Sequence, residues 1–139
     1  MSFELDSQLA SDTVELGLLG LSRVLLMKDA NYPWIILVPE RPAITELYEL
    51  DEGDQLTLMR EIAMLSQGMK QVFSADKMNV ANLGNMVPQL HIHLIARFKN
   101  DPAWPGPVWG AVERKPYEED ALAQRVAALR QLVASVSTT

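Results

Sequence analysis

The sequence has no cysteine, and this absence excludes disulfide bonds, thiolate catalysis and cysteine-ligated zinc. It also has no long apolar run. The longest strongly apolar stretch, residues 34–38, is far too short to span a bilayer. The chain opens without a basic segment followed by an apolar one, so no secretory signal is expected. We therefore expect a cytoplasmic protein that makes no membrane contact.

Lysine and arginine are sparse and nowhere clustered. Twelve basic residues stand against 18 acidic ones, which gives a net charge of −6. A protein of this charge is not expected to bind a nucleic-acid polymer through its phosphates. A small anionic ligand remains compatible, because the local field of a pocket can oppose the net charge. The length of 139 residues and the 48% hydrophobic content predict one domain over residues 1–139.

Histidine is scarce too, but both copies fall in the stretch 87–97. Apolar and polar residues alternate there, and this pattern predicts a β-strand in which residues two apart share a face. Gln89, His91 and His93 should project together. Leu90, Ile92 and Leu94 should fill the opposite, buried face.

This polar row has a plain interpretation and a functional one. Its three side chains can be hydrogen-bonded structural residues, since buried polar groups need partners. They can also share a metal, an anion or a substrate, and imidazole can serve as a nucleophile or proton donor. A His-x-His metal site needs further ligands, and no acidic residue lies beside the motif before Asp101. We therefore predict no metal site.

The rest of the chain predicts an α+β fold, an antiparallel sheet with a long central helix and a C-terminal helix packed on it. Strands are expected at 22–27 and 34–38, joined by a turn into a hairpin, and at 77–83. A turn followed by an edge strand is expected near residues 13–16. Helices are predicted at 51–73, with Asp51 as N-cap, and at 118–135. Their apolar stripes are Leu58, Ile62, Leu65, Met69 and Val72, and then Leu122, Val126, Leu129 and Val133.

Several polar and aromatic residues allow two interpretations. Asp29 can cap the hairpin turn. Asn79, Asn82 and Asn85 can be turn formers, or their amides can donate to an anion that faces the histidines. The loop 101–110 contains three prolines and two tryptophans, Trp104 and Trp109. It can be a substrate wall, a subunit contact or a loop folded on its own domain.

The stretch 84–95, Gly-Asn-Met-Val-Pro-Gln-Leu-His-Ile-His-Leu-Ile, resembles the signature of the histidine triad (HIT) superfamily of nucleotide hydrolases and transferases. That signature is His-φ-His-φ-His-φ-φ, where φ is apolar, after a turn containing glycine. The order of hairpin, long helix and two strands over residues 20–100 is also similar, and loop 101–110 resembles a bacterial branch. The resemblance implies a HIT-like fold.

The resemblance also implies a chemistry. His91 would attack the α-phosphorus of a nucleotide, of the dinucleoside polyphosphate or phosphoramidate type, and form a nucleotidyl-histidine intermediate. A backbone carbonyl would hold its other ring nitrogen. His93 would donate to the phosphate or protonate the leaving group. Gln89, the third predicted catalytic residue, takes the place of the first histidine; its amide can donate a hydrogen bond but cannot titrate. A nucleotide-binding protein with little catalysis is therefore the alternative.

Further residues carry over from the same resemblance. Asn85 would contact phosphate, Asp29 the ribose hydroxyls, and Arg97 stands at a basic position after the motif. Together with Asn79, these are the predicted nucleotide-binding residues. The resemblance implies a homodimer that acts on a small-molecule nucleotide without a cofactor.

Overall fold

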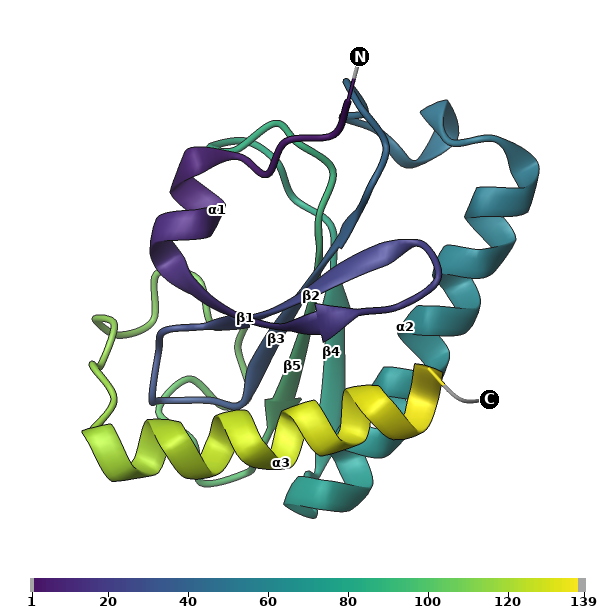
Figure 1. Ribbon diagram of the computed structural model, residues 1–139. Helices are drawn as coiled ribbons and strands as arrows, with labels where there is room; N and C mark the ends of the chain where they lie inside the picture. Colours follow the sequence, from purple (N-terminus) through teal and green to yellow (C-terminus); the bar gives the residue numbers. More distant parts are fainter. Residues whose placement is uncertain (1, 138–139) are drawn as a thin grey trace.

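The computed structural model describes residues 2–137. Figure 1 shows a central sheet with α2 along one side and α3 crossing below it. The elements in chain order are α1 (Ser7–Asp12), β1 (Thr13–Leu18), β2 (Ser22–Met27), β3 (Trp34–Pro39), the 3₁₀ turn η1 (Leu47–Glu49), α2 (Glu52–Phe73), β4 (Lys77–Ala81), β5 (Ile92–Arg97) and α3 (Glu119–Ser137).

The five strands form one antiparallel sheet in the order β1-β2-β3-β5-β4. β2 and β3 make the predicted hairpin, in which Leu25 lies opposite Ile36. β5 lies between β3 and β4, so the strand that carries His93 is interior. β1 and β4 are the two edge strands. The predicted α+β fold class is confirmed.

The long central helix begins and ends as its sequence requires. The side chain of Asp51 accepts a hydrogen bond from the Asp54 backbone N–H, which makes it the predicted N-cap. The helix ends at Phe73 and is capped by Ser74, whose φ of 51° is left-handed. The predicted stripe is wrong at Val72, which is 49% exposed. Phe73 packs on the core instead, because a step of four residues from Met69 keeps the same face.

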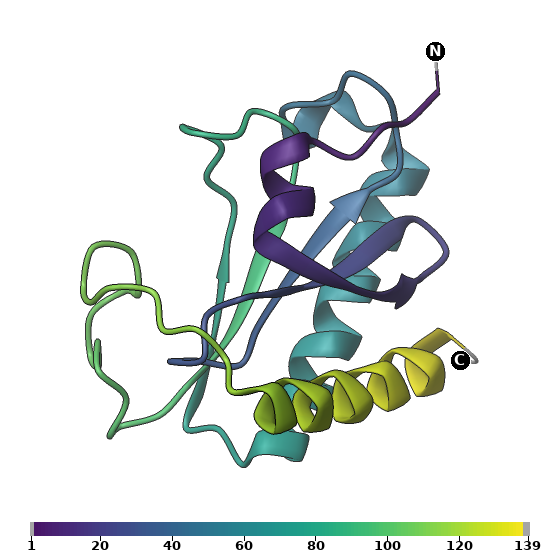
Figure 2. The ribbon, with the colours of Figure 1, turned by 60° about the vertical axis from the view of Figure 1, so that its left-hand side comes forward.

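The two faces of the sheet are covered differently. Side chains of α2 and α3 pack with one face in the larger core cluster, which includes Ile35, Leu37 and Leu94. The opposite face carries Trp34, Ile36 and Ile95, and it is covered by α1 and by the loop after β5. Figure 2 shows α1 apart from α2, with strands between them. The histidine positions belong to this second face.

Three predicted boundaries are wrong. Helix α1 replaces the expected turn before β1, because the Asp6 carboxylate caps it by accepting from the N–H groups of Gln8 and Leu9. The third strand ends at Ala81 rather than at residue 83. The histidine strand begins at Ile92 rather than at residue 87. Pro88 has no N–H to donate to a ladder, and the N–H of Leu90 bonds a loop carbonyl, that of Ile44.

Candidate functional site

β5 places His93 in the middle of the sheet. Its partners across the ladders are Ile36 on β3 and Ala81 on β4. His91 stands just before the strand and keeps the same side, with its ring centroid 4.9 Å from that of His93. Both side chains are buried, with 5% and 4% of their surface exposed. The two imidazoles therefore form a compact pair, as the alternation predicts.

The ring of His91 is held by the backbone. Its Nδ1 lies 2.6 Å from the carbonyl oxygen of Gln89. A carbonyl oxygen only accepts hydrogen bonds, so Nδ1 carries the proton and donates it. Nε2 is then the ring nitrogen with a free lone pair. A neutral imidazole in this tautomer is a nucleophile held in a fixed orientation.

His93 is held by an aromatic cage. The indole Nε1–H of Trp34 donates to its Nδ1 over 3.0 Å. The ring of Trp109, from the loop after β5, meets the imidazole edge-to-face with a centroid distance of 5.0 Å. Burial, and after it the neighbouring His91, lowers the pKa of His93 to about 3. His93 is therefore neutral at physiological pH.

A pocket of about 300 Å³ lies in front of the histidine pair. Its walls come from α1, the sheet, the loop between β4 and β5, and the tryptophan loop. Gly84 makes the turn in this wall with φ of +106°, which favours glycine. The residues lining the pocket are Leu9, Asp12, Met27, Ile36, Leu83, Gly84, Asn85, Met86, Val87, His91, His93 and Trp109. The histidines thus face a cavity, and Asn85 lines the same cavity.

Gln89 lies outside the lining of this pocket. Its side-chain Oε1 accepts a hydrogen bond of 2.8 Å from the backbone N–H of Asp6, and its Nε2 donates over 2.8 Å to the carbonyl of Glu4. Residues 88–91 are irregular, so the amide does not continue the row of imidazoles. Through these two hydrogen bonds Gln89, a predicted catalytic residue, ties the N-terminal segment to residues 87–91, which precede β5.

The remaining predicted binding residues are not brought to the histidine pocket. Asp29 accepts from the backbone N–H groups of Asn31 and Lys115, so its carboxylate caps the β2–β3 turn. Asn79 accepts a hydrogen bond of 2.8 Å from Arg97 Nη1. The guanidinium of Arg97 also pairs with Asp101, and only 1% of the residue is exposed. These three side chains are engaged in structural contacts.

The HIT domain family model matches residues 10–100, about two thirds of the chain. The chain belongs to the HIT family. Its members are nucleotide-binding proteins, hydrolases and transferases, and the predicted family is confirmed. None of the curated proteins matches the sequence.

Solved structures of bacterial HIT proteins resemble this one over nearly their whole length. A histidine triad protein from Marinobacter aquaeolei is 50% identical, with a TM-score of 0.95 over 98% of this chain and 99% of that one. A histidine triad protein from Bradyrhizobium japonicum is 46% identical, with a TM-score of 0.93 over 96% and 99%. One from Sinorhizobium meliloti is 43% identical, with a TM-score of 0.89 over 93% and 96%.

The sequence did not single out Trp34, which holds His93, or the pocket residues Leu9 and Asp12. Trp34 and Ile36 are two residues apart, so they share one face of β3. This spacing could have been recognised from the sequence, but the pairing of β3 with β5, which brings Trp34 to His93, could not. Leu9 and Asp12 belong to a helix that was not predicted. Trp109 belongs to the loop for which a substrate wall was one interpretation, and it does line the pocket.

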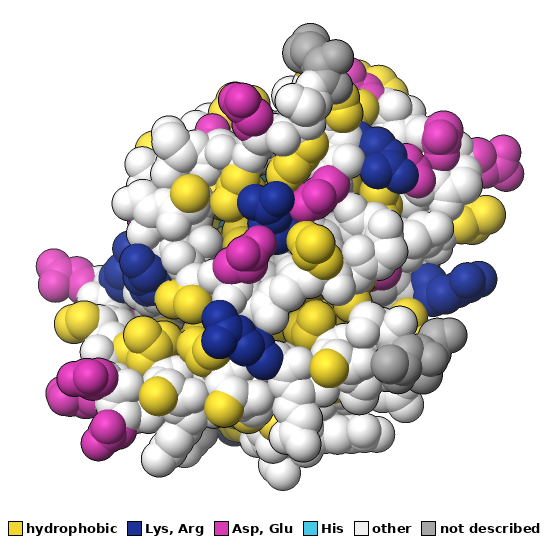
Figure 3. All heavy atoms as spheres, viewed as in Figure 1, with side chains coloured by type: hydrophobic (Ala, Val, Ile, Leu, Met, Phe, Trp, Pro, Cys, Tyr) yellow, Lys and Arg dark blue, Asp and Glu magenta, His cyan; other side chains and the backbone are white. Residues whose placement is uncertain are grey.

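Membrane-spanning helices, groups of metal ligands and basic surface patches were sought among the described residues. Among residues 2–137, no helix is both long and apolar enough to cross a bilayer, and no three His, Asp or Glu side chains group as metal ligands. On the face shown in Figure 3, the Lys and Arg side chains lie apart, several of them next to acidic ones. That face offers no basic patch for a nucleic-acid polymer.

Proposed function

We propose that this HIT protein is an enzyme that cleaves the bond between the α-phosphate of a nucleotide and its leaving group, with His91 as nucleophile. The observation that carries the proposal is the 2.6 Å hydrogen bond from His91 Nδ1 to the Gln89 carbonyl, which in the neutral ring leaves the lone pair on Nε2 of a residue that lines the pocket. This contact uses the backbone of residue 89, so glutamine in place of the first triad histidine does not remove it.

In the proposed reaction the Nε2 lone pair attacks the α-phosphorus and forms an N–P bond, while the bond to the leaving group breaks. Water or another acceptor then attacks phosphorus and releases His91. Splitting the displacement into two steps is the general advantage of a covalent nucleophile. A volume of about 300 Å³ is at the lower end for small-molecule sites, so it suits one nucleotide with the leaving group outside.

The pocket offers neutral donors rather than cations for the phosphate. No Lys or Arg is among the described residues that line it, whereas His93 and the amide of Asn85 are. At its other side stands the carboxylate of Asp12, which pairs with Arg114 at 3.3 Å and accepts from Gln8 Nε2 at 2.9 Å. Each carboxylate oxygen can accept a further hydrogen bond, for example from a hydroxyl group. We therefore place the ribose toward Asp12, the role that the resemblance gave to Asp29.

The test of the mechanism is a covalent adduct. Mixed with dinucleoside polyphosphates and nucleoside phosphoramidates and then quenched, the parent protein should gain the mass of one nucleotidyl group. His91→Gly should form no adduct and lose turnover, because no nucleophile remains, and added imidazole should restore part of the turnover. Gln71→Ala, on the exposed side of α2, is the control and should behave like the parent.

Two other outcomes have clear meanings. Equal turnover by His91→Gly and the parent would contradict the mechanism. Calorimetry showing AMP binding, with no adduct and no turnover of either substrate type, would leave the alternative of a nucleotide-binding protein with little catalysis.

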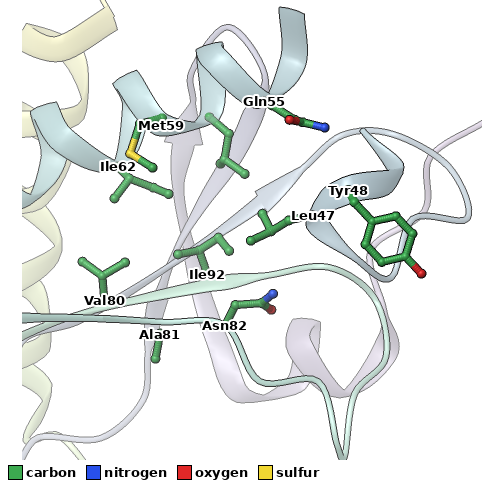
Figure 4. A pocket seen from close by; sticks show the side chains of 10 residues that line it. Leu47, Tyr48, Gln55, Met59, Ile62, Val80, Ala81, Asn82 and Ile92 are labelled. Carbon is green, nitrogen blue, oxygen red and sulfur yellow. The ribbon is translucent and has the colours of Figure 1, made fainter. Parts of the chain in front are cut away.

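We also propose a homodimer built on β4 and α2. β4 is an edge strand, so one side of its backbone has no partner strand among the described residues. Beside it lies an apolar groove of about 510 Å³ on the sheet face opposite the histidines, in which Val80 and Ile92 point toward Met59 and Ile62 of α2 (Figure 4). In such a dimer the β4 of a second copy would hydrogen-bond to the free backbone edge of β4, and its α2 would cover the groove.

A further inference from the structure

The hydrogen bond between Trp34 and His93 fixes where the imidazole proton lies. Trp34 is on β3 and His93 on β5, and both side chains are buried, with 6% and 4% of their surface exposed. The indole Nε1–H, 3.0 Å from His93 Nδ1, is a donor and never an acceptor. Nδ1 must therefore be the unprotonated nitrogen. In the neutral ring the proton is then on Nε2.

A second proton on this ring is opposed from several sides. It would have to go to Nδ1, where it would face the indole N–H. The aromatic rings of Trp34 and Trp109 enclose the imidazole, with centroid distances of 5.7 and 5.0 Å. Of the other titratable groups that line the pocket, His91 stands just before β5 and also disfavours a second proton, whereas the carboxylate of Asp12 on α1 is paired with Arg114 at 3.3 Å. The burial that lowers the pKa of His93 to about 3 acts in the same direction.

We propose that Trp34 is a positioning residue that fixes His93 as a neutral Nε2–H donor, and that the pocket therefore serves substrates whose leaving group departs without a proton from the protein. This inference rests on the proposed function and narrows its substrate class. His93 can donate a hydrogen bond to a phosphate oxygen. It does not act as a general acid.

The first step balances without a proton from His93. His91 Nε2 supplies the electron pair of the new N–P bond. The bond between phosphorus and the leaving oxygen breaks, and its electron pair goes to that oxygen. The leaving group departs as an anion, and the positive charge stays on the nucleotidyl-imidazole. In the second step water attacks phosphorus, the N–P pair returns to His91, and the proton of the water goes to solvent.

Leaving groups differ sharply in whether they can depart this way. A phosphate leaves as a stable anion, since its second pKa is about 6. A phenolate with an electron-withdrawing group behaves similarly. An alkylamine cannot leave as an anion, so its nitrogen must be protonated first. Phosphoric anhydrides, such as dinucleoside polyphosphates, are therefore the expected substrates, and alkylamine phosphoramidates are not.

The tautomer can be measured directly, without substrate. Nitrogen-15 shifts of the two imidazoles should show His93 of the parent as the Nε2–H form from pH 5 to pH 8, with no titration. In Trp34→Phe, which keeps an aromatic ring but loses the donor, His93 should become a mixture of tautomers, and its pKa should move toward the ordinary value. Trp109→Phe is the matched control, because that indole contacts the same ring edge-to-face, and it should leave the tautomer unchanged.

An Nδ1–H form of His93 in the parent, or a titration between pH 5 and pH 8, would overturn the inference even if Trp34→Phe does not fold. An unchanged tautomer in a folded Trp34→Phe would overturn the role of Trp34. None of these measurements depends on turnover, so the positioning role can stand or fail apart from the proposed function.

Turnover tests the substrate class. The parent should cleave an adenosine dinucleoside polyphosphate at least about a hundred-fold faster than an adenosine alkylamine phosphoramidate, because a general acid contributes about that factor or more. Between pH 5 and pH 8, the rate of anhydride cleavage should show no change that arises from protonation of His93. Equal rates for the two substrates would contradict the class while leaving His91 as nucleophile. No turnover of either would count against the proposed function alone.

Discussion

Gln89 stands where the resemblance expects the first triad histidine, and its amide has a structural partner at each end. The N–H of Asp6 and the carbonyl of Glu4 both bond it at 2.8 Å. A glutamine amide can donate and accept at once, whereas a neutral imidazole would need a different spacing to do both. The side chain therefore closes the N-terminal segment over the second sheet face, where α1 contributes Leu9 and Asp12 to the pocket.

Gln89→Ala should remove both hydrogen bonds and weaken the contact of the N-terminal segment with the second sheet face. Each lost hydrogen bond costs about 0.5–1.5 kcal/mol, so the free energy of unfolding should fall by about 1–3 kcal/mol. KM should rise more than kcat falls, because a pocket wall is released while His91 keeps the backbone carbonyl. Gln89→His, which introduces the histidine that the resembled signature carries at this position, should resemble Gln89→Ala rather than gain activity. Urea unfolding and steady-state kinetics measure both effects.

Gln71→Ala serves again as control and should stay within about 0.5 kcal/mol of the parent. A gain in kcat on Gln89→His would show that the first triad position limits the reaction. The structural role of the amide would then be secondary.

The histidine pair was predictable from sequence because its evidence is local. Two imidazoles two residues apart share a face whatever strand lies next to them. The partners of Asp29, Asn79 and Arg97 were not predictable in the same way. Arg97 meets Asn79 across 18 residues of sequence and Asp29 meets Lys115 across 86, so only the folded chain decides these contacts.

At the scale of elements, the tryptophan loop after β5 is fixed to the sheet by one buried ion pair. Arg97 Nε lies 2.8 Å from Asp101 Oδ2, and 2% and 3% of the two side chains are exposed. The Asp101 carboxylate also accepts from the backbone N–H groups of Phe98, Ala103 and Trp104. Burial alone raises its pKa, but these hydrogen bonds outweigh burial and lower the pKa to about 2. The carboxylate is thus charged at neutral pH.

Asp101→Asn should release this loop. It leaves the Arg97 guanidinium buried without its charge partner, which typically costs about 3–5 kcal/mol. Trp109 follows in the same loop and contacts His93, so tryptophan fluorescence should change and turnover should fall. Glu40→Gln is the matched control, since Glu40 pairs with Arg23 at 3.1 Å in a more exposed setting and should cost less than about 1 kcal/mol. Similar losses for both variants in chemical unfolding would contradict the anchoring role.

The helices and strands were predicted correctly where the side-chain periodicity extends over several helical turns or over a whole hairpin. α2, α3 and the β2–β3 hairpin each lie within two residues of their predicted bounds. α1 has six residues, too few to draw a stripe, and it depends on the Asp6 cap and on burial of Leu9. In residues 87–91, just before β5, polar and apolar side chains alternate as in a strand. The segment is irregular nevertheless, because Pro88 has no N–H and the N–H of Leu90 donates to the loop before α2. Short elements are decided by such tertiary contacts.

At the scale of the whole molecule, apolar surface gathers where the sheet ends. Leu47, Met59 and Val80 around the groove are 42%, 63% and 51% exposed, and Tyr48 is 79% exposed. An open strand edge beside exposed apolar side chains favours association with another strand. Two β4 edges paired antiparallel would extend the sheet through a two-fold axis and bring the two α2 helices together. This arrangement leaves the histidine pocket on the opposite face of each sheet.

Charge placed in this groove should separate the proposed dimer. Val80→Lys puts an ammonium group on β4 where the side chain points toward α2, and burying it against a second copy would be unfavourable. Val112→Lys is the matched control, because Val112 is 45% exposed and lies in the loop between β5 and α3. Sedimentation velocity should give a dimer for the parent and for Val112→Lys, and a monomer for Val80→Lys. A parent that sediments as a monomer at all concentrations, or a Val80→Lys variant that remains dimeric, would rule out this interface.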